Sequence, residues 1–198
     1  KRLDIPATSV LNIGDVPIED DWFRLAGWIV SEGCYSHSRG WPYISLSQSE
    51  TKNQKYCREI EKIFHGLGIK YYIHKNNHRN QWNGENTIIN QYTIAKESFH
   101  NIIDKIPEKY SIPKFVKDSS IRQKNLFLSS FIDGDGYIRK DGRRTLVFGS
   151  RRKELVDEFQ AIVTGMGYKS ILSYDNRGYG KFELTITKTN NLRLNQTG

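Results

Sequence analysis

The sequence of 198 residues contains only two cysteines, and no apolar run approaches the roughly 18 residues that a membrane span requires. Cys34 and Cys57 provide neither a disulfide framework nor the spacing of a metal site. No signal peptide opens the chain, and Lys1 stands where a complete reading frame would have Met, as in a trimmed or excised piece. These absences favour a soluble, intracellular protein in a reducing compartment such as the cytoplasm, a nucleoid or an organelle.

Common ligand-binding motifs are also missing. The sequence has no P-loop and no dinucleotide glycine fingerprint. The acidic stretch 133–136 is not a calcium loop, because Tyr137 stands where a third ligand is needed and Ile138 where glycine is required. His74 and His78 have no Cys or carboxylate at ligand spacing nearby, so we expect no zinc site there.

The charge of the chain is large and unevenly distributed. A hydrophobic content of 37% with 26% charged residues indicates a globular chain, long enough for one sizeable domain or two small ones. The formal net charge is +8. Residues 1–100 hold 12 basic and 11 acidic residues, a net of +1, whereas residues 101–198 hold 18 and 11, a net of +7. A basic surface in one half points to a polyanion as partner, and nucleic acid is the commonest one.

Two similar stretches lie 103 positions apart, Leu25–Gly33 and Leu128–Gly136. Each has Leu, two small residues, an aromatic residue and Ile, and each ends in a small residue, an acid and Gly. The pattern predicts two equivalent helices that each end in a carboxylate. Gly-x-Gly stops at 66–68 and 165–167 extend the correspondence, so we infer an internal duplication.

The duplication predicts an α+β fold of two αββαββα halves packed through the two motif helices, with two antiparallel sheets. The expected divisions are an irregular lead-in at 1–19, a first half at 20–110, a linker at 111–118 and a second half at 119–198. In the first half we expect a helix from 20 or 21 to Gly33, a hairpin over 34–48, a helix over 51–65, strands over 69–73 and 90–95 around a polar loop at 75–89, and a helix near 97–105. In the second half we expect a helix from 119 through the motif, a hairpin over 137–149, a helix over 151–164, and strands over 168–174 and 181–187.

Small residues mark one face of each motif helix. Gly27 and Ser31 are four residues apart, as are Ser130 and Gly134, so each pair lies on one side of its helix. Side chains this small let two helix backbones approach closely. We therefore expect the motif helices to pack on each other along these faces.

Such packing would bring Glu32 and Asp135 together at the helix ends. Two neighbouring carboxylates repel each other unless a cation lies with them. Mg²⁺ suits this arrangement, because it takes few carboxylates and fills its remaining positions with water and phosphate oxygens. A metal held by carboxylates beside a basic surface is typical of phosphodiester hydrolysis.

The two motifs resemble those of the LAGLIDADG homing endonucleases, in the single-chain form with two motifs, over about residues 20–188. The phrase at 112–115, Ile-Pro-Lys-Phe, resembles the intein-encoded (dodecapeptide) branch. The resemblance implies homing of an intron or intein by a monomer that cuts a long double-stranded DNA site with a divalent metal. Because the two halves differ in sequence, we expect the target to be asymmetric. Glu32 and Asp135 match the family's metal-binding catalytic acids, although Glu replaces Asp in the first motif. Lys96 and Lys188 match the place of a basic residue near the attacking water.

In this family the polar faces of the two sheets form a saddle along the major groove, where side chains reach base edges. The strand positions expected to contact bases are Tyr35, His37, Arg39, Ser45, Ser47, Lys70, Tyr72, His74, Tyr137, Arg139, Arg144, Lys169, Lys181, Glu183 and Thr185. The loop positions expected to hold phosphates are Lys75, His78, Arg79, Lys140, Arg143 and Arg177.

Two departures from the family pattern bear on activity. Val30 replaces the acid that precedes Glu32 by two positions, while Asp133 retains it in the second motif. The chain lacks the terminal residues that protein splicing needs. An RNA maturase or a non-cleaving DNA-binding protein on the same fold remains the alternative function, and a basic structural protein would explain the charge but not the duplicated motifs. Two retained acids favour cleavage, because a pure binder has no reason to place carboxylates beside phosphates.

Overall fold

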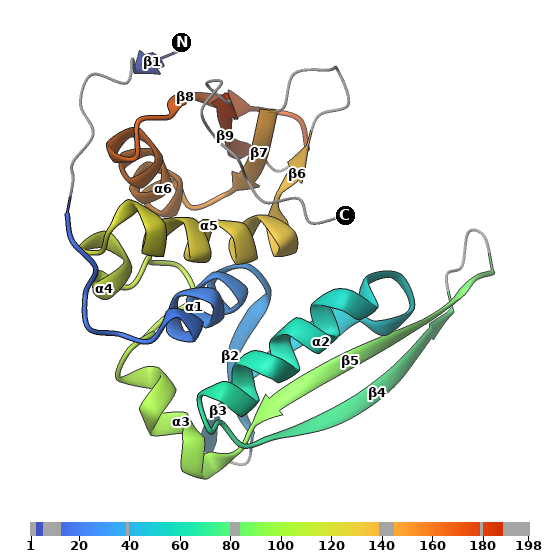
Figure 1. Ribbon diagram of the computed structural model, residues 1–198. Coiled ribbons are helices and arrows are strands. Elements are labelled where there is room, and N and C mark those ends of the chain that lie inside the picture. The colour runs from blue at the N-terminus through green and yellow to red at the C-terminus, as the bar shows by residue number, and fades with distance from the viewer. Residues whose placement is uncertain are drawn as a thin grey trace.

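Two antiparallel sheets lie on either side of a central helix pair, α1 (Asp20–Glu32) and α5 (Ile121–Asp135), in the computed structural model of the protein (Figure 1). The structure describes residues 3–5, 13–38, 40–79, 84–138, 145–178 and 180–187. The fold is α+β with the motif helices at its centre, which confirms the prediction from the sequence.

The first half contains a four-stranded sheet in the order β2-β3-β5-β4, with all neighbouring strands antiparallel. Ile44, Leu46 and Tyr92 are fully buried and lie on one face of this sheet, where α1 and α2 pack. The elements after α1 are β2 (Gly33–Ser38), β3 (Trp41–Ser49), α2 (Glu50–Gly66), β4 (Tyr71–Arg79), β5 (Asn86–Ile94) and α3 (Lys96–Ile103).

The second half repeats this arrangement around α5. Its sheet has the order β1-β8-β9-β7-β6, and α6 packs on one face, with the Phe159 ring 4.6 Å from the ring of Phe148. The counterpart of α3 would fall in residues 188–198, outside the described part. The remaining elements are β1 (Leu3–Ile5), α4 (Lys114–Lys117), β6 (Tyr137–Ile138), β7 (Thr145–Ser150), α6 (Lys153–Gly165), β8 (Lys169–Asp175) and β9 (Lys181–Thr187).

The lead-in is less irregular than the sequence predicts, because residues 3–5 form β1. This strand pairs antiparallel with β8 and adds a fifth strand to the second sheet. The pairing satisfies backbone groups at the edge of β8 that would otherwise be open. Three residues carry too little periodicity for the sequence to show such a strand.

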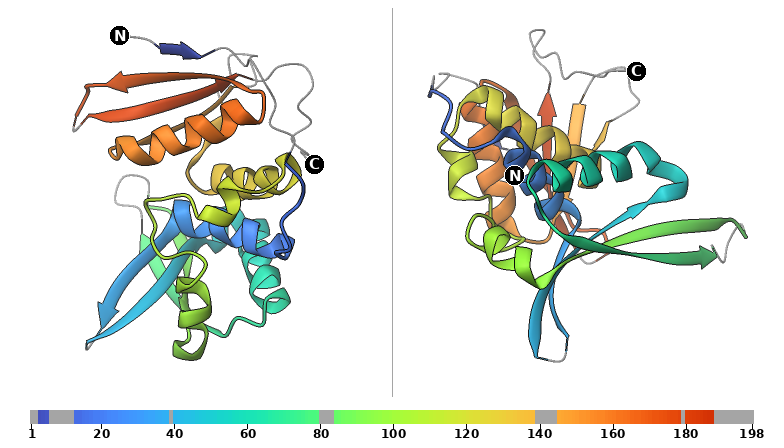
Figure 2. Two further views of the ribbon diagram at one scale, coloured as in Figure 1. Left: turned by 90° about the vertical axis from the view of Figure 1, so that its left-hand side faces the viewer. Right: turned by 60° about the horizontal axis from the view of Figure 1, so that its bottom comes forward.

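The prediction of a polar loop over residues 75–89 is wrong. β4 continues to Arg79 and β5 begins at Asn86, with Lys75 opposite Asn90 and the ladder closing at the Arg79–Asn86 pair. The hairpin extends past the start of α2, where Lys75 of β4 contacts Glu50 (Figures 1 and 2). Both faces of this extension meet solvent, so polar residues occupy a strand that apolar alternation cannot reveal.

Side chains and short elements join the two halves. The predicted linker contains α4, and Glu158 of α6 accepts a hydrogen bond from the Ile112 backbone N–H at 2.7 Å. Arg122 of α5 donates to Asp15 at 2.9 Å through Nε and to Asp20 at 2.6 Å through Nη1. These contacts fix the start of α1 against the start of α5.

Candidate active site

α1 and α5 touch backbone to backbone near their middles. A Cβ placed on Gly27 would lie 2.4 Å from the carbonyl oxygen of Phe127 and 2.8 Å from Cβ of Ser130. Side-chain carbons do not come that close to other atoms, so only glycine fits at position 27. Ser130 is only 2% exposed. The predicted close approach through small residues is therefore present.

A second contact repeats the first in reversed roles. A Cβ on Gly134 would lie 2.3 Å from Oγ of Ser31 and 3.2 Å from Cγ of Glu32. The Ser31 hydroxyl donates to the carbonyl oxygen of Gly27 at 2.9 Å, which removes its polar proton from the interface. The exchange of Gly and Ser between the helices gives the pair an approximate twofold relation.

Both helices end in the same way. Gly33 and Gly136 have extended backbone conformations, and their N–H groups donate to the carbonyl oxygens of Ile29 and Ile132. The chain then enters β2 in one half and β6 in the other. Glu32 and Asp135, each the last residue of its helix, therefore emerge at the same end of the helix pair.

Burial and nearby charge both act on the two carboxylates. Burial and, after it, the charge of Asp135 raise the pKa of Glu32. Burial also raises the pKa of Asp135. The positive charge of Lys109 acts in the opposite direction and lowers the pKa of both carboxyl groups. A site with two crowded carboxylates and one nearby lysine favours the binding of a further cation.

Lys109 was not among the residues predicted from the sequence. It lies in the connection after α3, which the hydroxyl of Tyr35 anchors by donating to the carbonyl oxygen of Ile106 at 2.6 Å. Ile106 is itself fully buried. The connection lies outside both repeated motifs, so no sequence pattern marked the lysine.

The structure does not bring Lys96 to the carboxylates. Its Nζ lies over the Trp41 ring, 3.5 Å from the ring centre. Trp41 is five residues along β3 from Leu46, the partner of Gly33, a separation of roughly 16 Å in an extended strand. The other predicted lysine, Lys188, lies outside the described residues.

Asp133, the second acid of the later motif, faces α2. The hydroxyl of Tyr56 donates to Oδ1 of Asp133 at 2.8 Å, a contact between the two halves. Burial raises the pKa of Asp133, and burial followed by the charge of Asp133 raises the pKa of Glu59. The carboxylate of Asp133 is thus engaged in a partly buried contact with α2.

Among the residues that the structure describes, no cluster of three or more His, Cys, Asp or Glu side chains could enclose a metal ion. Two adjacent carboxylates with solvent access nevertheless fit Mg²⁺, which typically binds proteins through one or two carboxylates together with water and phosphate oxygens. The donor set at Glu32 and Asp135 is all oxygen, as this ion prefers.

A family model for the LAGLIDADG-like domain matches residues 23–107 and again residues 122–195. The chain belongs to the LAGLIDADG-like family. The two matches cover the two halves of the fold, so the duplication inferred from the sequence is a duplication of this domain. No curated protein has significant sequence similarity to the chain.

Several solved structures share the LAGLIDADG-like fold. That of I-DmoI in complex with DNA and Mn has a TM-score of 0.60 at 12% identity, over 85% of this chain and 89% of that one. The homing endonuclease I-WcaI bound to its DNA recognition sequence gives 0.60 at 14%, over 87% and 77%. Full-length DUF199/WhiA from Thermatoga maritima gives 0.56 at 13%, over 87% and 53%. At these identities the similarity establishes the fold alone.

Each sheet of this LAGLIDADG-like chain has one face against helices and an opposite face, which we call the open face. Strand register assigns predicted contact residues to these faces, because paired residues share a side. His74 lies opposite Gln91, which lies opposite Ser47, whereas Ile73 lies opposite the buried Tyr92. The predicted residues that lie on open faces are Ser47, Tyr72, His74, His78, Lys169, Lys181, Glu183 and Thr185.

Two predicted base contacts in the first hairpin are not available. Tyr35 pairs with Ile44 and therefore lies on the helix side, where its hydroxyl bonds to Ile106. Ser45 is on the open side but is only 2% exposed, since its short side chain lies between Cys34 and Thr93 of the flanking strands. A one-residue difference in register reverses the face of every side chain, and the hairpin sequence alone did not fix it.

The helix side also holds Lys75 and Arg79, which lie in β4 and not in a loop. Lys75 Nζ is 2.9 Å from both carboxylate oxygens of Glu50. His37 shares the side of Tyr35 but is exposed at the hairpin end, and Lys70 is exposed, 3.5 Å from Glu97. Arg39, Arg139, Lys140, Arg143 and Arg144 lie outside the described residues, as does the side chain of Tyr137.

Among the described helices, none is both long and apolar enough to cross a membrane. The two cysteines are free, with Cys34 exposed and Cys57 buried.

Proposed function

We propose that the protein is a site-specific homing endonuclease that makes metal-dependent double-strand breaks in DNA. The observation that carries the proposal is the placement of Glu32 and Asp135 side by side by the α1–α5 contact. Each comes from an equivalent helix, so one carboxylate is available to each strand of a duplex lying across the helix ends. The DNA complexes of I-DmoI and I-WcaI support the same use of this fold.

Glu32 and Asp135 would hold a divalent cation, Mg²⁺ in the first instance. When bound, the ion would stabilise the attacking and leaving oxygens at the cleaved phosphate. I-DmoI was crystallised with DNA and Mn, and also with DNA and Ca. Lys109 would offset part of the negative charge that the carboxylates and the phosphate bring together.

The open faces of the two sheets would contact the DNA. Their exposed polar residues differ between the halves, so we propose an asymmetric target. Both carboxylates come from one chain, so a monomer completes the site. The basic bias of the second half provides long-range attraction for the duplex.

The test begins with selection of cleaved sites from a randomised DNA library in Mg²⁺, followed by assays on the selected duplex. Glu32→Gln and Asp135→Asn should each reduce double-strand cleavage at least about 100-fold with binding retained. Asp133→Asn is the matched control, because it removes a charge two positions away while still accepting from Tyr56. Equal cutting in EDTA, or full activity in either site variant, would refute the metal site. Tight, specific binding with no cutting in any divalent metal would establish the non-cleaving alternative.

A further inference from the structure

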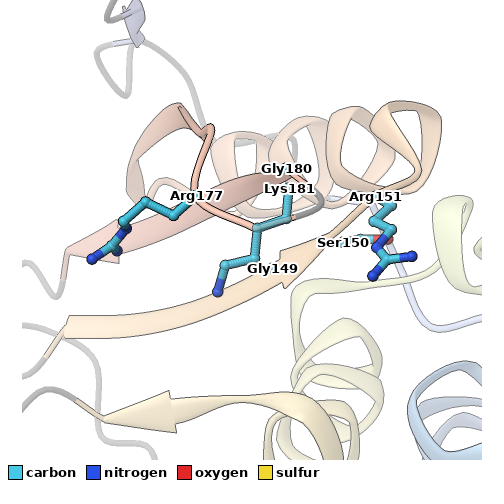
Figure 3. A pocket seen from close by; sticks show the side chains of 6 residues that line it. All are labelled: Gly149, Ser150, Arg151, Arg177, Gly180 and Lys181. Carbon is cyan, nitrogen blue, oxygen red and sulfur yellow. The ribbon is translucent and has the colours of Figure 1, made fainter.

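A shallow groove of about 230 Å³ lies at the end of β7 and the start of β9. Gly149 and Lys181 lie on the open face of the second sheet, opposite α6, because their neighbours Phe148 and Phe182 are on the helix side. Three of its six lining residues are basic. The lining residues are Gly149, Ser150, Arg151, Arg177, Gly180 and Lys181 (Figure 3).

The three cations form a row and do not converge on one point. Figure 3 shows Arg177 and Arg151 toward opposite ends of the groove, with Lys181 between them. Their charged ends point in different directions. A site for a single free anion would have its donors aimed at a common centre, so the row suits an extended anion with repeated charges.

Two of the cations rest on carboxylates. Arg177 donates to both oxygens of Asp175 at 2.9 Å, and Lys181 lies 2.8 Å from Glu183. The side chains of Asp175 and Glu183 are each only 14% exposed, whereas that of Arg177 is 86% exposed. The hydrogen bonds from Arg177 lower the pKa of Asp175 to about 2. Asp175 therefore stays ionised, and the two carboxylates hold Arg177 and Lys181 at the surface.

The open floor of the groove depends on Gly149. A Cβ at this position would lie 3.0 Å from Cδ of Lys181, so the absence of a side chain lets the lysine stem lie across β7. Three basic side chains among the six lining residues suit an anion. The glycine and the paired acids together give the row a defined shape.

Among the described residues of the first half, the two strand positions equivalent to Arg151 and Lys181 are not basic. Strand register makes Leu46 the equivalent of Phe148 and Tyr92 the equivalent of Leu184. By the same count, Ser49 and Ile89 stand where the second half has Arg151 and Lys181. The row is thus one structural location of the charge excess in residues 101–198.

We propose that Arg177, Lys181 and Arg151 bind successive backbone phosphates of one DNA strand and thereby fix the position of the second half on the duplex. This assignment rests on the proposed function, in which the open faces meet DNA. Phosphate contacts of this kind set register and orientation without reading base sequence. The first half, in which Ser49 and Ile89 occupy the equivalent strand positions, would depend more on base contacts.

The salt dependence of binding to a random-sequence duplex in EDTA tests the row without requiring cleavage. The triple variant Arg151→Gln/Arg177→Gln/Lys181→Gln should reduce the slope of log K against log salt concentration by about 2 to 3, since each phosphate contact contributes about 0.9. A control triple variant, Lys52→Gln/Lys114→Gln/Lys153→Gln, loses the same charge from helices and should leave the slope unchanged. Equal slopes for the two triple variants would overturn the proposal.

Two further measurements distinguish phosphate contacts by the row from a general effect of net charge and from a site for free phosphate. The fourfold variant Asp175→Asn/Arg177→Gln/Lys181→Gln/Glu183→Gln removes two acids and two bases and so keeps the net charge. It should still lower the salt-dependence slope by about 2, because two phosphate contacts are lost. Ethylation of individual DNA phosphates should weaken binding of the wild type at a few successive phosphates of one strand. Ethylation of the same phosphates should not weaken binding of the triple variant. Thermal stabilisation by inorganic phosphate, lost in the triple variant without any change in slope, would instead mark a free-anion site. If the triple variant lowers the slope as expected but the wild-type protein cleaves no DNA, only the proposed nuclease activity is refuted.

Discussion

Gly27 and Ser130 meet with no space for one more carbon: a Cβ on Gly27 would lie 2.8 Å from the Ser130 Cβ. This contact and its counterpart, Ser31 against Gly134, determine the separation of α1 and α5. They therefore also determine the separation of the two carboxylates that follow. Stability and chemistry share one interface in this protein.

Gly27→Ala and Gly134→Ala should each lower the free energy of unfolding by about 1 to 3 kcal/mol, because the added methyl group meets atoms that cannot move away freely. At Gly27 two of the three nearest atoms belong to the α5 backbone. Urea unfolding measures the change. Gly14→Ala is the control, since nothing lies within 4 Å of its added carbon. Equal stability of all three variants would contradict the packing.

The pH dependence of stability should reveal the paired acids. Burial raises the pKa of both Glu32 and Asp135, so ionisation destabilises the folded state. This penalty is fully present above the raised folded pKa and disappears below the unfolded pKa of about 4. In EDTA, Glu32→Gln and Asp135→Asn should therefore raise Tm at neutral pH and lose that advantage on acidification.

Addition of Mg²⁺ supplies a second measurement on the same proteins. An ion that binds the folded state alone raises Tm, so wild type should gain stability and the two variants should gain less. Variants that are no more stable than wild type at neutral pH would contradict the electrostatic crowding of the site.

The helix contact could be predicted from the motif sequence, because small residues spaced four apart are a local pattern. This pattern predicted Gly27, Ser31, Ser130 and Gly134 at the interface and, from them, the meeting of the helix ends. The sequence did not predict which face of the first hairpin each side chain occupies. Tyr35 pairs with Ile44, and a turn longer or shorter by one residue would change this register and reverse the faces.

Lys109 shows a different limit of the sequence. Its position depends on a hydrogen bond between Tyr35 and Ile106, 71 residues apart in the chain. No repeat or motif spacing records such a contact. The matching place after β5 instead suggested Lys96, which the fold directs to Trp41.

Tyr56→Phe should lower the free energy of unfolding by about 1 to 2 kcal/mol, because Asp133 loses its 2.8 Å hydrogen bond between the halves. Denaturant unfolding measures the loss. Tyr72→Phe is the matched control, since the Tyr72 side chain is exposed. In a double-mutant cycle with Asp133→Asn, a coupling energy near zero would show that the contact contributes nothing.

Lys109→Gln should reduce cleavage about 10- to 100-fold while DNA binding changes little. Lys109 opposes the rise in pKa at both Glu32 and Asp135, so its removal should raise both values. The acidic limb of the rate–pH profile should then move to higher pH. Lys105→Gln, which removes a nearby charge that lies over the Trp22 ring, is the control. An unchanged profile in Lys109→Gln would refute its role.

Adjacent residues His74 and Lys75 offer a test of the open face, because they point to opposite sides of β4. His74 lies in a cross-strand row with Gln91 and Ser47, whereas Lys75 is bound by Glu50 of α2. His74→Ala should change the bases selected at a few neighbouring positions in one half of the target, with each changed base pair worth about 1 to 3 kcal/mol. Lys75→Ala should leave the selected sequence unchanged and lose at most about 1 kcal/mol of stability. Selection from a randomised library reads both results at once. If Lys75→Ala altered the selected bases and His74→Ala did not, the DNA would lie against the other face of the sheet, and the saddle arrangement would be wrong.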